Sequence, residues 1–240
     1  QLAVDDGVTH MACTPHVKPG LYPNNTSTIT SAISLLSDEL EKQNIPLQLL
    51  IGADVHIDPK LLSGLTNRII PSLNNTRYFL FEPTHQVMPP KIVEFASSLL
   101  RADYIPILTH PERLSWIEDG YNVICRLDEM GVPMQLTAGS ITGKFGSRVK
   151  YWSERMLAEG RIDIIASDAH NIKSRPPGLS EAAEKIEKQL GKEAMKKIVH
   201  QNPLLIINDD VLPEKVRREA QVQKPERKSG VKELFSKLLK

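Results

Sequence analysis

The chain has 240 residues, of which 40% are hydrophobic and 25% charged, and its formal net charge is +1 at pH 7. This composition is typical of a soluble globular protein and excludes the fibrous and disordered classes. No run of eighteen apolar residues occurs, and the N-terminal stretch lacks the basic and apolar regions of a secretory signal. Neither a membrane span nor export is indicated, so we expect a cytoplasmic protein.

Charge and aromatic content also limit the classes of partner. Aromatic residues make up 5% of the chain, and the excess of basic residues is confined to residues 213–240. A nucleic-acid-binding surface needs clustered positive charge or aromatic stacking residues. We therefore expect no nucleic-acid partner.

Short apolar runs alternate with longer amphipathic stretches along the chain, which predicts βα units and a mainly parallel sheet. The predicted strands comprise residues 8–12, 47–55, 78–81, 104–108, 134–137 and 162–166. The predicted helices comprise residues 28–43, 92–101, 123–130, 149–159, 181–190 and 192–200, with Asn202 and Pro203 ending the last one. Because each strand is almost continuously apolar, it should be buried on both faces, as in a doubly wound sheet or a barrel covered by helices.

Ionisable residues follow the ends of five of the six apolar runs. They are His16, Asp54, Glu82, His110, Asp168 and His170. In βα barrels the carboxyl ends of the strands converge on one mouth, so these groups should meet there and could hold more than one divalent cation. Taken singly, each could be a helix cap, a core residue or a surface charge. Three other histidines do not follow the end of an apolar run, and we interpret them as structural or solvated: His10, His85 and His200.

The two cysteines, Cys13 and Cys125, are far apart and lack the Cys-x5-Arg arrangement of cysteine-dependent phosphatases. They cannot build a disulfide framework either, which agrees with a reducing compartment. A thiol nucleophile is therefore not expected.

Several motifs carry a family resemblance. They are TPH at 14–16, GxDVxI at 52–57, FEP at 81–83, HPER at 110–113, TAGS at 137–140, GxFG at 143–146 and SDAHN at 167–171. With them the sequence resembles the PHP (polymerase and histidinol phosphatase) family, and more closely its capsular and exopolysaccharide protein-tyrosine phosphatase branch. The resemblance covers about residues 1–190. It implies an α/β fold of the distorted, TIM-like (β/α)7 PHP barrel type, with a metal cluster at its mouth.

The resemblance also implies roles for individual residues. His16, Glu82 and His110 would be metal ligands, joined by Asp168 and His170, while Asp54 takes the place of a bridging glutamate one methylene longer. Arg113 and Arg175 would hold the substrate phosphate and act in catalysis, since a guanidinium offers two parallel donors to a tetrahedral oxyanion.

The function implied by the resemblance is metal-dependent hydrolysis of phosphotyrosine. The substrate would be the cytoplasmic tail of a bacterial tyrosine kinase that controls capsular or exopolysaccharide synthesis and export. The cofactors would be two or three divalent ions per chain, with manganese expected and iron or zinc as alternatives. Two other functions stay open: a small-molecule phosphomonoesterase of the histidinol-phosphate phosphatase type, and a non-catalytic PHP barrel that binds a phosphorylated partner. The oligomeric state is not indicated.

One departure from the family concerns the first strand, which in PHP proteins carries a His-x-His pair. Nothing before residue 8 resembles it, and the predicted strands number one fewer than a seven-stranded barrel needs. Either the natural chain extends upstream by roughly 25 residues, enough for one strand and one helix, or the barrel lacks this strand. We expect the first alternative, with a His-x-His in the extension.

Residues 213–240 differ in composition from residues 1–212, for which we expect the phosphatase barrel. The tail is basic, punctuated by proline and poor in apolar residues, which predicts partial disorder. It ends in an apolar stripe at 231, 234, 235, 238 and 239, typical of an amphipathic helix. Such a helix could dock on the body or contact a membrane surface or a partner. From about Lys215 onward we expect the tail to be dispensable for hydrolysis of a short peptide.

Overall fold

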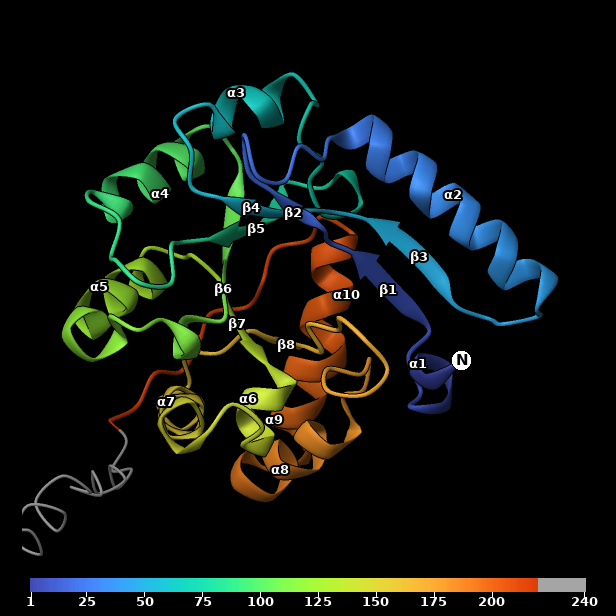
Figure 1. Cartoon of the computed structure of the whole chain (residues 1–240). Helices are drawn as coiled ribbons and strands as arrows, with labels where there is room; N and C mark the ends of the chain where they lie inside the picture. Colours follow the sequence, from blue (N-terminus) through green and yellow to red (C-terminus); the bar gives the residue numbers. More distant parts are fainter. Residues whose placement is uncertain (220–240) are drawn as a thin grey trace, which may run out of the picture.

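Parallel strands form the centre of the computed structural model, which describes residues 1–219 (Figure 1). The strands are β1 (His10–Cys13), β2 (His16–Val17), β3 (Gln48–Ile51), β4 (Asp54–His56), β5 (Tyr78–Glu82), β6 (Ile105–Thr109), β7 (Met134–Thr137) and β8 (Ile164–Ala166). Six of them form one curled sheet in the order β2-β4-β5-β6-β7-β8, and β1 pairs with β3 in a second sheet. The pairing is parallel throughout both sheets.

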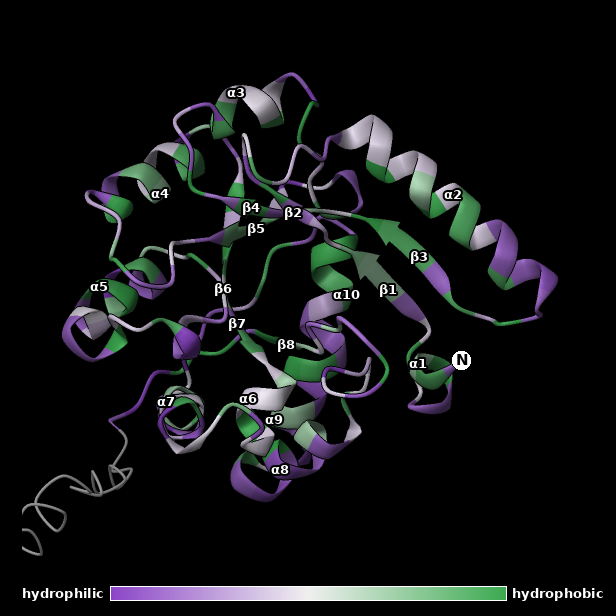
Figure 2. Ribbon diagram, in the orientation of Figure 1, coloured by the Kyte–Doolittle hydropathy of each residue, from purple (hydrophilic) through white to green (hydrophobic). Residues whose placement is uncertain are grey.

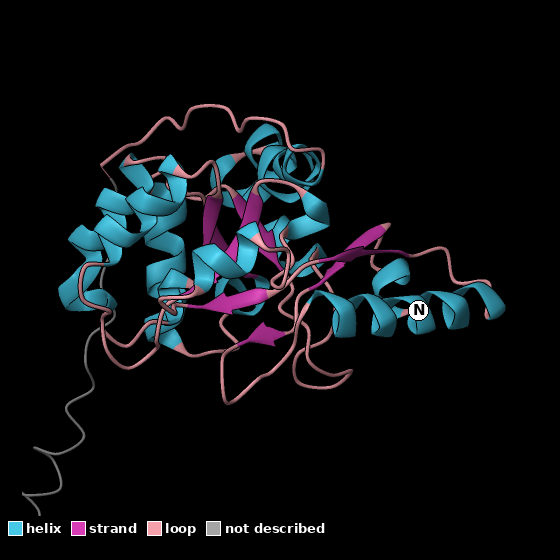
Figure 3. Cartoon of the chain, turned by 90° about the horizontal axis from the view of Figure 1, so that it is seen from above, coloured by secondary structure: helices cyan, strands magenta, loops and turns pink. Residues whose placement is uncertain are grey.

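Helices lie around the two sheets (Figure 1). They are α1 (Leu2–Asp5), α2 (Thr26–Lys42), α3 (Leu61–Thr66), α4 (Ile92–Arg101), α5 (Ile117–Glu129), α6 (Ala138–Thr142), α7 (Ser147–Ala158), α8 (Ser180–Leu190), α9 (Lys192–Lys196) and α10 (Asn202–Ile207). In Figure 1, α3, α4, α5 and α7 follow one another around the strands, whereas β1, β3 and α2 extend to one side, as Figure 3 also shows.

Burial explains why the apolar runs form strands. Every residue of β5 is buried, and Ile107 and Leu108 of β6 and Met134 and Leu136 of β7 have no exposed surface. Strands covered on both faces read as continuous apolar runs, because neither face meets water. Figure 2 shows β6 largely in the hydrophobic colour. The alternation of strands and helices predicted from the sequence is confirmed in this α/β arrangement.

Two of the predicted strands differ from the structure. The strand predicted for residues 8–12 is shifted to His10–Cys13, and a short strand that was not predicted, β2, follows it after Thr14 and Pro15. The strand predicted for residues 47–55 is divided into β3 and β4 at Gly52. Pro15 has no N–H to donate, and a side chain on Gly52 would lie 2.7 Å from Leu73. The two paired strands therefore bend together at this point, and the Asp54 N–H to Pro15 carbonyl bond of 3.1 Å continues the pairing.

Two helix boundaries also differ from the prediction. The helix predicted for residues 123–130 begins earlier, at Ile117. The helix predicted to end before Pro203 instead continues through a π turn, Lys197–Gln201, into α10. The wider turn changes the hydrogen-bond register before Pro203, so the missing proline N–H does not end the helix.

The segment that follows α10 lies against the body as far as residue 219 is described. Lys215 is almost buried, and its Nζ lies 2.5 Å from Asp128 Oδ1 and 2.6 Å from Asp163 Oδ2. Arg217 also contacts Asp128, and the Arg218 N–H donates to the Glu159 carbonyl. Residues 215, 217 and 218 of the predicted tail therefore contact the body of the protein.

The predicted amphipathic helix near the C-terminus lies outside the described residues. Among residues 1–219, no helix combines the length and apolarity that crossing a membrane requires.

Candidate metal and phosphate site

Strand register brings four ionisable side chains together at the carboxyl end of the sheet. His16 on β2 is paired with Asp54 on β4, and His56 on β4 is paired with Glu82 on β5. Asp54 and His56 are two residues apart on one strand, so their side chains share a face. The four groups therefore occupy one corner of the sheet.

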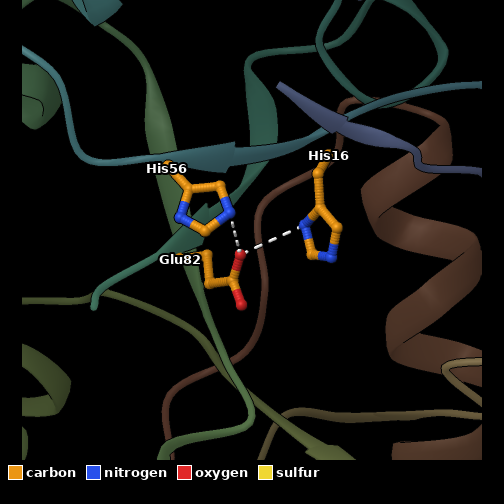
Figure 4. A group of neighbouring side chains, drawn as sticks. All are labelled: His16, His56 and Glu82. Atoms are coloured by element: carbon orange, nitrogen blue, oxygen red, sulfur yellow. Dashed lines mark ion pairs between the residues drawn. The ribbon is translucent and has the colours of Figure 1, made fainter. Parts of the chain in front are cut away.

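The two carboxylate oxygens of Glu82 face different pairs of histidines. Oε2 lies 2.8 Å from His56 Nε2 and 3.1 Å from His16 Nδ1, and Figure 4 shows both rings directed at it. Oε1 lies 3.2 Å from His85 Nε2 and 3.4 Å from His110 Nε2. Each oxygen with its two ring nitrogens forms a group close enough to hold one cation. Glu82 thus has the geometry of a carboxylate shared between two cation sites.

Asp54 lies next to the histidines that surround Glu82. Its Oδ2 is 3.8 Å from His16 Nδ1 and 3.9 Å from His110 Nε2, so it stands between the two histidine pairs. Burial, and then the charge of Glu82, raise the pKa of Asp54 to about 8. Two neighbouring buried carboxylates repel each other, and a cation between them would relieve this repulsion.

The donor atoms fit a divalent cation. His16 Nδ1, His56 Nε2 and Glu82 Oε2 are buried and close together, yet among the described residues none has a partner in hydrogen-bond geometry. Buried polar atoms without partners are costly and unusual. Imidazole nitrogens and carboxylate oxygens, with no thiolate among them, suit manganese, iron or zinc.

Protonation also favours ligand roles. Burial and the charge of Arg113 lower the pKa of His110 to about 3, so its ring is neutral near pH 7. Burial alone would raise the pKa of Glu82, but contacts with His16, His56 and His85 hold it well below its usual range. A neutral imidazole and an ionised carboxylate are the forms that bind metals.

Two residues that follow strands adopt left-handed backbone conformations. His110 has φ of 37° and Asp168 has φ of 51°. Side-chain-bearing residues rarely adopt such angles, which concentrate at functional sites. The two residues start the loops after β6 and β8, and those loops carry Arg113 and Arg175.

Arg113 and Arg175 converge on one carboxylate oxygen. Arg113 Nη1 lies 2.7 Å from Asp168 Oδ2, and Arg175 Nη2 contacts the same oxygen. An oxygen held by two guanidinium groups marks a place suited to an anion. A cavity of about 180 Å³ adjoins Arg175 and is lined in part by Ala138, Gly139, Phe145 and Ser167.

Glu112 connects the HPER loop to the TAGS turn. Its side chain is fully buried, and Oε1 accepts hydrogen bonds from the Thr137 N–H at 3.0 Å and from the Ser140 hydroxyl at 2.6 Å. These bonds fix the turn Pro111–Arg113 relative to β7 and α6, and thereby the starting point of the Arg113 side chain.

Not all the predicted ligands meet in one group. The histidine groups contain His16, Glu82 and His110 as expected, with Asp54 alongside. Asp168 and His170 lie apart on the rim: Asp168 pairs with the arginines, and His170 Nδ1 lies 3.6 Å from Asp168 Oδ1 with its side chain 44% exposed. In the described part of the chain, neither belongs to a histidine group.

Two residues of the cluster were missed by the sequence reasoning. His85 was interpreted as structural or solvated, but it contacts Glu82 because the loop after β5 folds back over that strand end. His56 was not considered. Its position two residues after Asp54, directly after the apolar run 47–55, is a signal that could have found it.

The cysteines are unsuited to nucleophilic catalysis. Burial raises the pKa of the Cys13 thiol and likewise that of Cys125. A reactive cysteine needs a lowered pKa, so the exclusion made from the sequence agrees with the structure.

Comparisons with known proteins agree with this geometry. Residues 1–208 match the family model described as "Capsular polysaccharide synthesis, CpsB/CapC". The chain is 33% identical over 219 residues to tyrosine-protein phosphatase YwqE of Bacillus subtilis (strain 168), covering 90% of this chain and 86% of that protein. It is 28% identical over 208 residues to tyrosine-protein phosphatase CpsB of Streptococcus agalactiae serotype V, covering 85% of this chain and 86% of that protein.

The fold has a solved counterpart as well. A crystal structure from work on YwqE of Bacillus subtilis and CpsB of Streptococcus pneumoniae, described as unique metal-dependent tyrosine phosphatases, superposes with a TM-score of 0.85 at 32% identity. The superposition covers 93% of this chain and 89% of the chain in that crystal structure. The chain therefore belongs to the CpsB/CapC family of capsular polysaccharide synthesis.

Proposed function

We propose that this protein is a metal-dependent protein-tyrosine phosphatase. The observation that carries the proposal is the arrangement around Glu82, whose two oxygens each face a separate pair of histidines. Elsewhere at the same end of the sheet, Arg113 and Arg175 converge on one oxygen of Asp168. Cation ligands next to a paired anion site are suited to metal-assisted hydrolysis of a phosphate ester. The family relatives named as tyrosine-protein phosphatases support the same activity.

The residues that would hold the cations are Glu82 with His16 and His56 on one side and with His85 and His110 on the other. Asp54 stands close enough to join either group through a small movement, and Asp168 and His170 would close the cluster from the rim. When bound, divalent cations lower the pKa of a bound water molecule to near neutrality and polarise phosphoryl oxygens. We propose two or three ions per chain, with manganese first and iron or zinc as alternatives.

Arg113 and Arg175 would bind the phosphoryl oxygens. Their guanidinium donors can form parallel charge-assisted hydrogen bonds, and these strengthen as negative charge builds on the oxygens in the transition state. The leaving phenolate of tyrosine has a pKa of about 10, so its departure needs little help from a general acid. With both thiols protonated, a phosphoenzyme on cysteine is not part of this proposal.

The physiological substrate we propose is the phosphorylated cytoplasmic tail of a bacterial tyrosine kinase that controls capsular or exopolysaccharide synthesis. Support comes from the capsular role in the family description. We further propose that the curled sheet is part of a PHP-type (β/α)7 barrel in a cytoplasmic protein, and that the basic C-terminal residues contact a partner or an anionic membrane surface.

Metal dependence and phosphotyrosine selectivity test the proposal together. The purified chain is treated with EDTA, then supplied with Mn²⁺, and phosphate release is followed from matched phosphotyrosine and phosphoserine peptides. We expect loss of activity with EDTA, recovery with Mn²⁺ and preference for phosphotyrosine. Thiol alkylation should leave the activity intact. Activity that survives complete removal of metal, or that disappears on alkylation of Cys13 or Cys125, would contradict the proposal.

A further inference from the structure

An aromatic ring lies beneath both arginines of the anion site. The Arg113 guanidinium carbon is 4.7 Å from the centroid of the Phe145 ring, and that of Arg175 is 5.8 Å from it. Arg113 follows β6 and Arg175 follows β8, whereas Phe145 comes from the turn between α6 and α7, after β7. Three loops at the same end of the sheet therefore meet at this ring.

The backbone around Phe145 fixes the position of the ring. The turn that carries it contains Gly143 with φ of 87° and Gly146 with φ of 90°, angles that residues with side chains rarely adopt. The ring packs on α6, where a Cβ on Gly139 would lie 2.9 Å from Phe145 Cε2 and 3.4 Å from Cζ. Only a residue without a side chain at position 139 leaves room for the ring in this place.

Electrostatics gives the ring a further effect on the arginines. Two guanidinium groups that point at one oxygen carry like charges and repel each other. Each arginine side chain also has many rotamers, so the convergent arrangement is one of many. The face of an aromatic ring is electronegative and attracts cations within about 6 Å of its centroid. A ring placed under both groups lowers the energy of the one arrangement in which they converge.

We propose that Phe145 is a positioning residue that holds Arg113 and Arg175 together in the orientation that binds the substrate phosphate. This inference rests on the proposed phosphatase function for its kinetic consequences, but not for the contact itself. Phe145 acts through the two arginines and does not touch the phosphate. The Phe145 and Gly139 positions of the GxFG and TAGS motifs thereby serve the same anion site.

Three substitutions and one control separate the effect of the ring from simple packing. Phe145→Leu keeps an apolar side chain but removes the aromatic face, and Phe145→Tyr restores that face. Gly139→Ala should push the ring away from α6 while favouring the helix itself, since alanine is the better helix former. Phe95→Leu is the matched control, because Phe95 stacks on Phe81 and belongs to α4.

Phosphate affinity and arginine spectroscopy provide the readouts. Inhibition by inorganic phosphate, kcat/KM for a phosphotyrosine peptide and metal content are measured for each variant. In the zinc-loaded protein, NMR follows the Nε–Hε signals of Arg113 and Arg175, which a nearby aromatic ring shifts.

For Phe145→Leu and Gly139→Ala we expect phosphate affinity and kcat/KM to fall about three- to tenfold, the range of a cation–π contact. The two arginine signals should move while metal content stays normal. Phe145→Tyr and Phe95→Leu should match the wild type.

Other outcomes would overturn the inference. One is unchanged phosphate affinity and unchanged arginine signals in Phe145→Leu. Another is a loss of affinity for the aryl phosphate alone, which would show that the ring stacks on the substrate. If the wild-type chain hydrolyses nothing, the proposed function fails, yet phosphate binding and the arginine signals still decide whether Phe145 holds the two side chains.

Discussion

His56 Nε2 lies 2.8 Å from Glu82 Oε2, on the neighbouring strand of the sheet. The two residues are direct register partners, so their backbone positions hold the side chains together. His16 reaches the same oxygen from the other side of β4. One carboxylate oxygen and two imidazoles in this arrangement make His56 a predicted metal ligand.

Replacing His56 by alanine should therefore weaken metal binding. We expect the affinity for Mn²⁺ to fall by at least about tenfold, because one ligand of one group is lost while the other group keeps its donors. Titration calorimetry and metal analysis measure this. His10→Ala is the control, since His10 is an exposed histidine at the start of β1. Normal metal content and affinity in His56→Ala would exclude the ligand role.

Glu82→Gln should weaken metal binding more than His56→Ala does. Glutamine keeps the size of the side chain but removes the negative charge that faces both histidine pairs. We expect metal content to fall at both groups and activity to drop on the order of a hundredfold or more. A variant that loses only one ion, as judged by metal analysis, would show that Glu82 is not shared.

Arg113→Ala and Arg175→Ala should separate phosphate binding from metal binding. Both arginines contact Asp168 and neither belongs to a histidine group. We expect kcat/KM to fall by about ten- to a hundredfold through lost transition-state stabilisation, with metal content near normal. His110→Ala, in contrast, should lower both. Metal loss in Arg175→Ala would assign that residue to the metal shell instead.

Lys215→Met should destabilise the fold, because Lys215 is held in buried ion pairs. The Lys215 ammonium lies between two buried carboxylates, Asp128 and Asp163. Removing one partner from a buried ion pair typically costs about 3–5 kcal/mol, because the remaining charge stays buried. Chemical denaturation at pH 7 measures the change in the free energy of unfolding, and the exposed Lys192→Met is the control. A change below about 1 kcal/mol, the usual value for a surface pair, would contradict the buried role.

The loss of unfolding free energy caused by Lys215→Met should be smaller at acid pH than at pH 7. Burial alone would raise the pKa of Asp128, but Arg217 and Lys215 lower it, so its stabilising contribution is lost as pH falls through its folded pKa. Burial raises the pKa of Asp163, and losing Lys215 should raise it further. Protonation of Asp163, whose pKa is raised, removes the charge that the substitution leaves unpaired, whereas Asp128 keeps Arg161 and Arg217 as partners. A deficit that stays constant down to pH 3 would point to packing rather than charge.

Two truncations should differ sharply. A chain that ends after Glu219 keeps the Lys215 and Arg217 contacts with Asp128 and should match the full chain in stability and in peptide hydrolysis. A chain that ends after Leu212 loses these contacts and the Arg218 N–H bond to Glu159. We expect it to lose stability like Lys215→Met. Equal stability of the two truncated chains would show that residues 213–219 contribute nothing to the fold.

The fold class and most of the ionisable residues of the candidate site could be predicted from the order of residues along the chain. Burial on both faces makes a strand such as β5 a continuous apolar run, and that pattern is local and readable. The polar residues that follow these runs, such as His16, Glu82 and His110, could be located for the same reason. Cys13 and Cys125 were excluded as nucleophiles from their neighbours in the sequence alone.

Which of these residues meet became apparent in the folded chain alone. His56 and His85 join Glu82 because of strand register and a folded-back loop, and Lys215 finds Asp128 across 87 positions of the chain. Such contacts depend on how strands pair and how loops return, and spacing along one strand, as between Asp54 and His56, places side chains on a shared face without naming their partners. The contacts of Asp168 with Arg113 and Arg175 likewise depend on how the loops after β6 and β8 meet in the folded chain.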